Sequence, residues 1–223
     1  DSTMMKSTAL SSLFLIILTI LPCQFHSVAF AADDEEKYIT CGSVVKFQHV
    51  ESGAYLHSEE KNMGGGSGQQ IVTWIPQVGD TSNLWWIREG NDDKYCVAGS
   101  PIQCGDKIRL THLDTMRNLH THNVQSPLSR QQEVSAFGQG DGQGDTGDDW
   151  ILECSTGNWK RGANARLRHV DTNKYLGGSS TVKFTAQNCG GGCPIMNHLE
   201  SFARGQKDDY SNFKVEMGIH LSK

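Results

Sequence analysis

The chain has 223 residues, of which 37% are hydrophobic and 20% are charged, and its formal net charge is −5 at pH 7. This length suffices for one large or two small domains with a hydrophobic core. The 24 glycines follow no collagen repeat and only 5 prolines accompany them, so a fibrous or disordered chain is not expected. Because the chain is mildly acidic and has no basic run, we expect neither nucleic acid nor an anionic membrane as a partner.

Residues 1–31 are typical of a secretory signal peptide, preceded at Asp1-Ser2-Thr3 by an expression or translation remnant. The apolar run from Ala9 to Leu21 is too short to span a bilayer comfortably, and the small residues of Ala29-Phe30-Ala31 predict cleavage after Ala31 or Ala32. The alternative is a signal anchor that stays attached. We expect the mature chain, residues 32–223, to enter the secretory lumen without membrane insertion.

A threefold repeat organises the sequence after residue 40. Its unit is apolar-x-apolar-x-His-apolar-acid-Ser/Thr, and its histidines are His49, His112 and His169, which lie 63 and 57 residues apart. Each unit is followed by an aromatic landmark: Trp86, Trp150 and Phe213. The repeats span about residues 37–97, 98–156 and 157–217. We expect the three histidines and the three landmarks to be structural positions.

Within each unit, apolar and polar residues alternate with the period of half-buried strands, and turn residues separate the strands. No segment after residue 40 has the apolar period of a dependable helix. Three four-stranded units, each unable to bury its own face, predict an all-β fold, and specifically a single β-trefoil domain with pseudo-threefold symmetry. A propeller needs more blades, and an ordinary sandwich gives no reason for three equal units.

Six cysteines remain after signal cleavage, and in an oxidising lumen they favour disulfides over catalysis or metal binding. They are Cys41, Cys96, Cys104, Cys154, Cys189 and Cys193. Cys96 and Cys104 bracket a short turn that contains Pro101, which suits a local bridge. The sequence leaves the full connectivity open, because six cysteines allow fifteen pairings.

The sequence contains no nucleophile elbow, phosphate loop or zinc-protease motif, so we expect no catalytic residue, no cofactor and no metal. His120 and His122 fall on one face of a strand and, with His57, are the candidate ligand-binding residues. The acidic stretch Asp141–Asp149 lacks the terminal glutamate of a calcium loop and is interpreted as solvated. Trp74, Trp85 and Trp159 could stack on sugars, although core positions are the more common role of such residues.

The repeat unit resembles the MIR motif of protein O-mannosyltransferases, inositol trisphosphate receptors and ryanodine receptors. From about residue 37 to 217 the chain is similar to the stromal cell-derived factor 2-like family, and specifically to a plant member. The stretches that carry the resemblance include Tyr38–Lys46, Pro101–Gly105 and Gln132–Gly138. The resemblance implies a β-trefoil and favours the bridges Cys96–Cys104 and Cys41–Cys154, while Cys189 and Cys193 lie outside the family pattern.

The resemblance also implies residence in the endoplasmic reticulum lumen, with a J-domain co-chaperone and BiP as partners in stress responses and glycoprotein quality control. We therefore expect a non-enzymatic module that assists folding of misfolded or nascent secretory clients. The chain ends in His220-Leu221-Ser222-Lys223 rather than a retrieval signal of the HDEL type, so partial secretion is also expected. One alternative is a lectin-like module that binds glycans. A weaker alternative is an accessory module related to O-mannosyltransferases.

Overall fold

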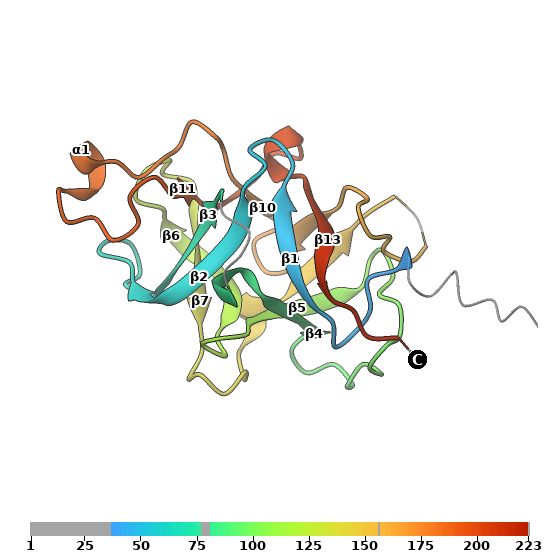
Figure 1. The fold of residues 1–223 in the computed structure, drawn as a ribbon. Helices are drawn as coiled ribbons and strands as arrows, with labels where there is room; N and C mark the ends of the chain where they lie inside the picture. The colour runs from blue at the N-terminus through green and yellow to red at the C-terminus, as the bar shows by residue number, and fades with distance from the viewer. Residues whose placement is uncertain (1–36, 77–80, 156, 223) are drawn as a thin grey trace, which may run out of the picture. The chain divides into compact units, whose positions relative to one another are not determined.

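The computed structural model describes residues 37–76, 81–155 and 157–222, so the signal-peptide assignment lies outside the described residues. Thirteen strands form one sheet of largely antiparallel neighbours (Figure 1). The first repeat contributes β1 (Val44–His49), β2 (Tyr55–Asn62), β3 (Gln70–Ile75) and β4 (Trp85–Glu89). The second contributes β5 (Lys107–His112), β6 (Asn118–Gln125), β7 (Gln132–Phe137) and β8 (Trp150–Glu153). The third contributes β9 (Arg166–His169), β10 (Tyr175–Gly177), β11 (Leu199–Glu200), β12 (Phe202–Arg204) and β13 (Phe213–Ile219).

Two of these strands from each repeat close into a ring. In order, β1 pairs with β4, β4 with β5, β5 with β8, and β8 with β9. A bridge between Ala165 and Phe213 joins the start of β9 to β13, and β13 lies beside β1 (Figure 1). The hairpin strands meet separately, because β3 pairs with both β7 and β11, and β7 pairs with β12. The prediction of an all-β fold is therefore confirmed.

Helices make only a small contribution to the described residues. The 3-10 helices η2 (Thr81–Asn83), η3 (Thr146–Asp148) and η4 (Asp209–Ser211) each end two residues before the ring strand that closes their repeat. The α-helix α1 (Ala186–Cys189) is a single turn in the third repeat. No helix in the described ranges combines the length and the apolar composition that crossing a bilayer requires.

The aromatic landmark of the first repeat is Trp85. The prediction that Trp86 occupies this position was wrong. Trp85 is fully buried, lies opposite His112 across the sheet and donates from its indole nitrogen to the Leu56 carbonyl at 3.2 Å. Trp150 makes the corresponding bond to the Leu119 carbonyl at 2.9 Å. Trp86 is only half-buried, because successive residues of a strand point to opposite faces and a shift of one residue reverses the face.

The three repeated histidines make the same pair of hydrogen bonds. In each, Nδ1 lies 2.8–2.9 Å from a hydroxyl three residues later, and Nε2 lies 3.0–3.1 Å from a backbone carbonyl of a neighbouring segment. Since a carbonyl can only accept, Nε2 carries the hydrogen in all three. Each ring thus ties its own hairpin turn to the 3-10 helix region that precedes the adjacent ring strand. The residues are His49, His112 and His169, and they are at most 1% exposed.

Replacing any one of these histidines with alanine should lower the free energy of unfolding by about 1–3 kcal/mol, because buried hydrogen-bonding groups lose their partners. Urea denaturation of the three single variants measures the change. The zinc content of the purified protein should be the same before and after substitution. Stoichiometric zinc that disappears with a histidine would contradict the structural role.

Three disulfides link the six cysteines, and both specific pairings expected from the sequence were wrong. The bonds join Cys41 to Cys96, Cys104 to Cys154 and Cys189 to Cys193. The segment between Cys96 and Cys104 contains a turn at residues 97–100, closed by the Ser100 amide donating to the Val97 carbonyl at 2.9 Å, but its two ends pair with different parts of the fold. Its first part pairs with Cys41 through the Gly99 and Ser100 backbones, and the Cys104 amide donates to the Gly157 carbonyl at 2.8 Å. Cys96 therefore lies next to Cys41, and Cys104 lies next to Cys154.

This connectivity can be checked directly by mass mapping of peptides from the non-reduced protein. We expect linked peptides for Cys41–Cys96, Cys104–Cys154 and Cys189–Cys193. A Cys96–Cys104 peptide would contradict the fold around Pro101, whose backbone bridges to Thr40.

Candidate functional site

A polar pocket of about 500 Å³ opens beside the second repeat. Strand β6 supplies His120 and His122, and the η3 region supplies Asp145, Thr146 and Gly147. The remaining lining comes from neighbouring segments: Gln69, Thr121, Asn123, Phe137, His169, Asp171 and Thr172. Residues from all three repeats therefore meet at this pocket.

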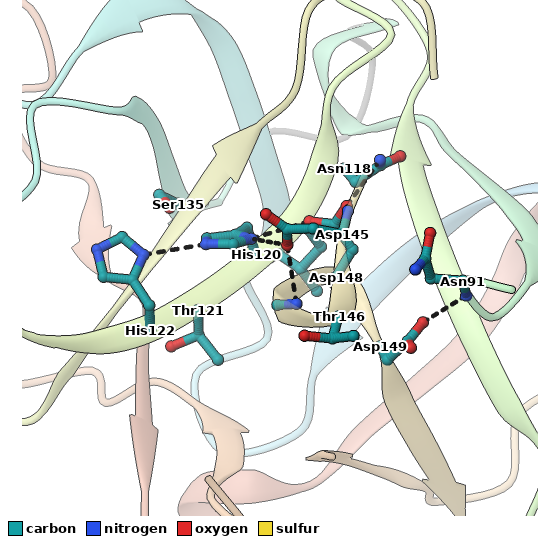
Figure 2. Close-up of polar contacts among 12 residues, drawn as sticks. Asn91, Asn118, His120, Thr121, His122, Ser135, Asp145, Thr146, Asp148 and Asp149 are labelled. Atoms are coloured by element: carbon teal, nitrogen blue, oxygen red, sulfur yellow. Dashed lines mark hydrogen bonds and ion pairs between the residues drawn. The ribbon is translucent and has the colours of Figure 1, made fainter. Parts of the chain in front are cut away.

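A chain of hydrogen bonds runs from the buried Asp148 through His120 to His122 (Figure 2). The Asp148 Oδ1 atom lies 2.9 Å from His120 Nδ1, and His120 Nε2 lies 3.0 Å from His122 Nδ1. When Asp148 Oδ1 accepts from His120 Nδ1, the His120 Nε2 atom is left to accept, and His122 donates to it from Nδ1. In this arrangement His122 keeps Nε2 as a hydrogen-bond acceptor for a ligand.

Asp148 is fully buried, and both of its carboxylate oxygens are used. Its Oδ2 atom accepts from the Asn118 side chain and from the Asp145 backbone amide, each at 3.0 Å. The corresponding positions at the ends of η2 and η4 are Asn83 and Ser211. Only the second repeat therefore places a carboxylate here, and it faces a histidine.

Two glycines allow the loop to approach these side chains closely. A Cβ atom at Gly147 would lie 2.2 Å from a carbon of the His120 ring, and one at Gly144 would overlap the Asp148 carboxylate. Asp145 accepts a hydrogen bond from the Gly147 amide at 2.9 Å, and its side chain is 57% exposed. The prediction that the acidic stretch is solvated was thus wrong at its end, where Asp148 and Asp149 are buried.

His120, Asp145 and Asp148 place one potential metal-ligand atom each within 4.8 Å of the others. The carboxylate oxygens, however, already accept hydrogen bonds from His120 and from backbone amides. These bonds account for the arrangement without an ion. The pocket is therefore lined by hydrogen-bonding groups whose positions these bonds hold.

Burial lowers the pKa of His122 below its ordinary value, and the neighbouring His120 lowers it further. Burial likewise lowers the pKa of His169, which also lines the pocket, against smaller opposing effects of the Gly147 carbonyl and Asp171. Both rings are consequently neutral at pH 7, and His122 therefore presents an imidazole rather than an imidazolium to the pocket.

The free energy of unfolding should fall as the pH drops from about 7 toward 5. The pKa values of five histidines are lowered in the folded state, so below about 6.5 the unfolded chain binds more protons than the folded protein. They are His49, His122, His169, His198 and His220, the last with its pKa lowered to about 4. Urea denaturation across this range measures the slope. His220→Gln should reduce it, and a stability independent of pH between 7 and 5 would contradict the assignment.

Of the three candidate ligand residues, the structure brings His120 and His122 together and places His57 elsewhere. His57 is 5% exposed, and its Nδ1 atom lies 3.1 Å from the Thr73 hydroxyl. Its ring packs edge-on against His198 at 5.1 Å, and it is not among the residues that line the pocket.

The sequence analysis missed Asp145 and Asp148, which lie well beyond His120 in the chain. The repeat aligns Asp148 with Asn83, since each stands two residues before its landmark tryptophan, but this alignment does not show that a carboxylate contacts His120. The suggested sugar-stacking role was wrong for Trp74, Trp85 and Trp159, because all three are at most 1% exposed.

Comparison with known proteins places this architecture in a family. The MIR domain matches residues 65–153. The stromal cell-derived factor 2-like protein of Dictyostelium discoideum is 38% identical over 220 residues, which cover 96% of this chain and 100% of the relative. The crystal structure of the SDF2-like protein from Arabidopsis thaliana is similar with a TM-score of 0.73 and 34% identity, covering 83% of this chain and 98% of that one.

A larger protein contains a similar unit. The S. cerevisiae protein O-mannosyltransferase Pmt1-Pmt2 complex, bound to the sugar donor, matches 82% of this chain but only 26% of the matched chain, with 27% identity and a TM-score of 0.68. The extent of the similarity to the Dictyostelium protein decides the assignment, because it covers nearly the whole of both chains. The chain therefore belongs to the stromal cell-derived factor 2-like family.

Proposed function

We propose that this protein is a β-trefoil binding module of the endoplasmic reticulum lumen, without enzymatic activity, that assists folding and glycoprotein quality control. Its partners are a J-domain co-chaperone and BiP, and its clients are nascent or misfolded secretory chains. Membership of the stromal cell-derived factor 2-like family over nearly the full chain is the observation that carries this proposal. The closed ring of strands suits it, since such a ring offers a rigid surface to a partner.

The chemistry of the polar pocket supports binding rather than catalysis. The hydroxyls of the described lining belong to Thr121, Thr146 and Thr172. They bond to the Glu133 carbonyl, the Asp171 carboxylate and His169 Nδ1 respectively, and not to His120, which a hydrolase would use to activate them. Both ring nitrogens of His120 are instead hydrogen-bonded, Nδ1 to Asp148 and Nε2 to His122. The pocket would then recognise a ligand by hydrogen bonds and leave it chemically unchanged.

Carbohydrate binding is the second candidate function, and the polar pocket is the observation that favours it. His122, Asp145 and Asp171 offer acceptors for sugar hydroxyls, and the half-buried ring of Phe137 packs on His120 at 4.9 Å. A sugar ring could contact such an aromatic face while its hydroxyls bond to the surrounding acceptors.

A glycan array with the mature protein distinguishes the two functions. Selective sugar binding that is lost in His122→Ala and kept in the loop variant Asp141→Ala would establish the lectin-like function. Absence of binding to every glycan, together with binding of the co-chaperone, would leave the folding module as the function. An accessory role related to O-mannosyltransferases would instead require association with such an enzyme.

A further inference from the structure

The third repeat contains a segment that the other two lack. Its landmark Phe213 follows His169 by 44 residues, whereas Trp150 follows His112 by 38. The additional chain includes α1 and packs into a small apolar cluster that is separate from the main core. The buried members of this cluster are Met63, Ile71, Phe184 and Ile195. In Figure 1 α1 stands at the margin of the described fold, beyond β11 and β3.

An apolar groove of about 480 Å³ lies on this cluster. One wall is the end of the first-repeat hairpin, from Lys61 to Gly65, and a second is formed by Pro127 of the second repeat. The added segment supplies the third wall with Phe184, Cys189 and Ile195. The groove is therefore distinct from the polar pocket, with which it shares no lining residue.

The third wall carries a disulfide. Cys189 and Cys193 are bonded to each other across three exposed glycines, and both cysteines are half-buried. Cys189 lines the groove, whereas Cys193 is not among its lining residues. A thiol held in the groove would thus meet the Cys189 sulfur first.

The other two disulfides have a different setting. Cys41–Cys96 and Cys104–Cys154 join segments 55 and 50 residues apart. Cys41 belongs to the main core and Cys96 and Cys154 pack against it, while Cys104 is half-buried. A thiolate must reach a sulfur along an open path to exchange with it. Cys189–Cys193 meets this condition in the folded protein, on a segment whose opening leaves the strand ring intact.

We propose that Cys189–Cys193 is a thiol–disulfide exchange site, and that the groove beside it binds apolar, cysteine-bearing segments of unfolded secretory chains. This proposal rests on the proposed function, because it names a client class for a folding module. The apolar walls favour an apolar client segment. The Cys189 sulfur in the third wall can exchange only with a thiol, so the segment must carry a cysteine. Small charged thiols would bury little apolar surface against these walls and would therefore bind weakly in the groove.

The exchange balances without any further reactant. A client thiolate attacks Cys189 Sγ, the Cys189–Cys193 bond breaks, and its electron pair leaves on Cys193 Sγ, which takes up a proton. A second client thiolate then attacks the client sulfur of the mixed disulfide and releases Cys189 as a thiol. One client dithiol becomes a disulfide, and one protein disulfide becomes a dithiol. The reverse reaction uses the same steps.

Two single variants test which of the two sulfurs forms the mixed disulfide with the client, here by attack of the free protein thiolate on the peptide disulfide. The probe is an apolar synthetic peptide with one cysteine carried as a mixed disulfide with thionitrobenzoate, and a polar peptide of equal length is its control. Cys193→Ser leaves Cys189 free in the groove, and Cys189→Ser is the matched control that leaves Cys193 free. We expect thionitrobenzoate release about tenfold faster from Cys193→Ser, and only with the apolar peptide. Equal rates for the two variants, or for the two peptides, would overturn the proposal.

The full chain with all three disulfides provides the second test. It is incubated with an apolar peptide dithiol, quenched with acid and mapped by mass spectrometry. Oxidised peptide should appear together with reduced Cys189 and Cys193, while Cys41–Cys96 and Cys104–Cys154 stay intact. Reduction of all three disulfides in parallel, or of none, would refute the site. Co-chaperone binding by a variant with both cysteines replaced by serine is measured separately, so failure of the exchange is distinguishable from failure of the proposed function.

Discussion

Trp85→Ala should lower the free energy of unfolding by about 3–5 kcal/mol, as expected for removal of a fully buried indole from a core. The side chain is 0% exposed, packs on His112 at a ring distance of 5.1 Å and donates to the Leu56 carbonyl. Alanine would leave a cavity inside the ring of strands, and the Leu56 carbonyl would lose one donor while keeping the Asn83 side-chain amide. Urea denaturation followed by fluorescence or circular dichroism measures the loss.

The adjacent tryptophan is the control for this substitution. Trp86 points to the other face of β4, is half-buried and stacks with the Arg88 guanidinium at 4.5 Å. Trp86→Ala should therefore cost about 1 kcal/mol or less. If Trp86→Ala proves as damaging as Trp85→Ala, the register of β4 against β5 is wrong.

Asp148→Ala should also cost about 3–5 kcal/mol, because it removes the shared acceptor of three donors, two of them on buried side chains. These donors are His120 Nδ1, the Asn118 side-chain amide and the Asp145 backbone amide. The last of them fixes the start of η3, so the substitution should also loosen the wall of the polar pocket. The measurement is again urea denaturation at neutral pH.

Asp141→Ala is the matched control, since Asp141 is exposed in the same acidic loop and bonds only to the Gln143 amide among the described contacts. Its effect should stay within about 0.5 kcal/mol. A small loss for Asp148→Ala, comparable with that control, would mean that the buried carboxylate does not organise the pocket.

The fold class could be predicted because strand alternation and the threefold repeat are both local features of the sequence. The position of the aromatic landmark in the first repeat could not be predicted, because Trp85 and Trp86 are adjacent tryptophans. Strand register alone decides which of them is buried. That register depends on pairing with β5, where Trp85 lies opposite His112. A repeat alignment read from the sequence has no access to this pairing.

The disulfides show the same limit. Nearness in sequence favoured Cys96–Cys104, yet the backbone between them bridges to Thr40 through Pro101 and to Asn158 through Gln103. These long-range bridges extend the segment and separate its two ends. Connectivity therefore follows from the tertiary fold and not from the spacing of the cysteines.

Half of the candidate site could be predicted, since His120 and His122 share a strand face. Their carboxylate partner could not be identified from spacing, because it reaches His120 only when η3 packs against β6. The equivalents of Asp148 in the other repeats, Asn83 and Ser211, are uncharged, so the repeat pattern gives no general rule for this position. The site arises where one repeat departs from the others.

Binding to the co-chaperone tests the proposed function most directly. The mature protein, isolated from a secretory host, is titrated with a purified J-domain co-chaperone of the endoplasmic reticulum in a calorimeter, and BiP with ATP is then added. We predict saturable binding with a fixed stoichiometry and a ternary complex with BiP that sediments as one species. Absence of heat and of co-sedimentation at concentrations well above those of the lumen would contradict the proposed function.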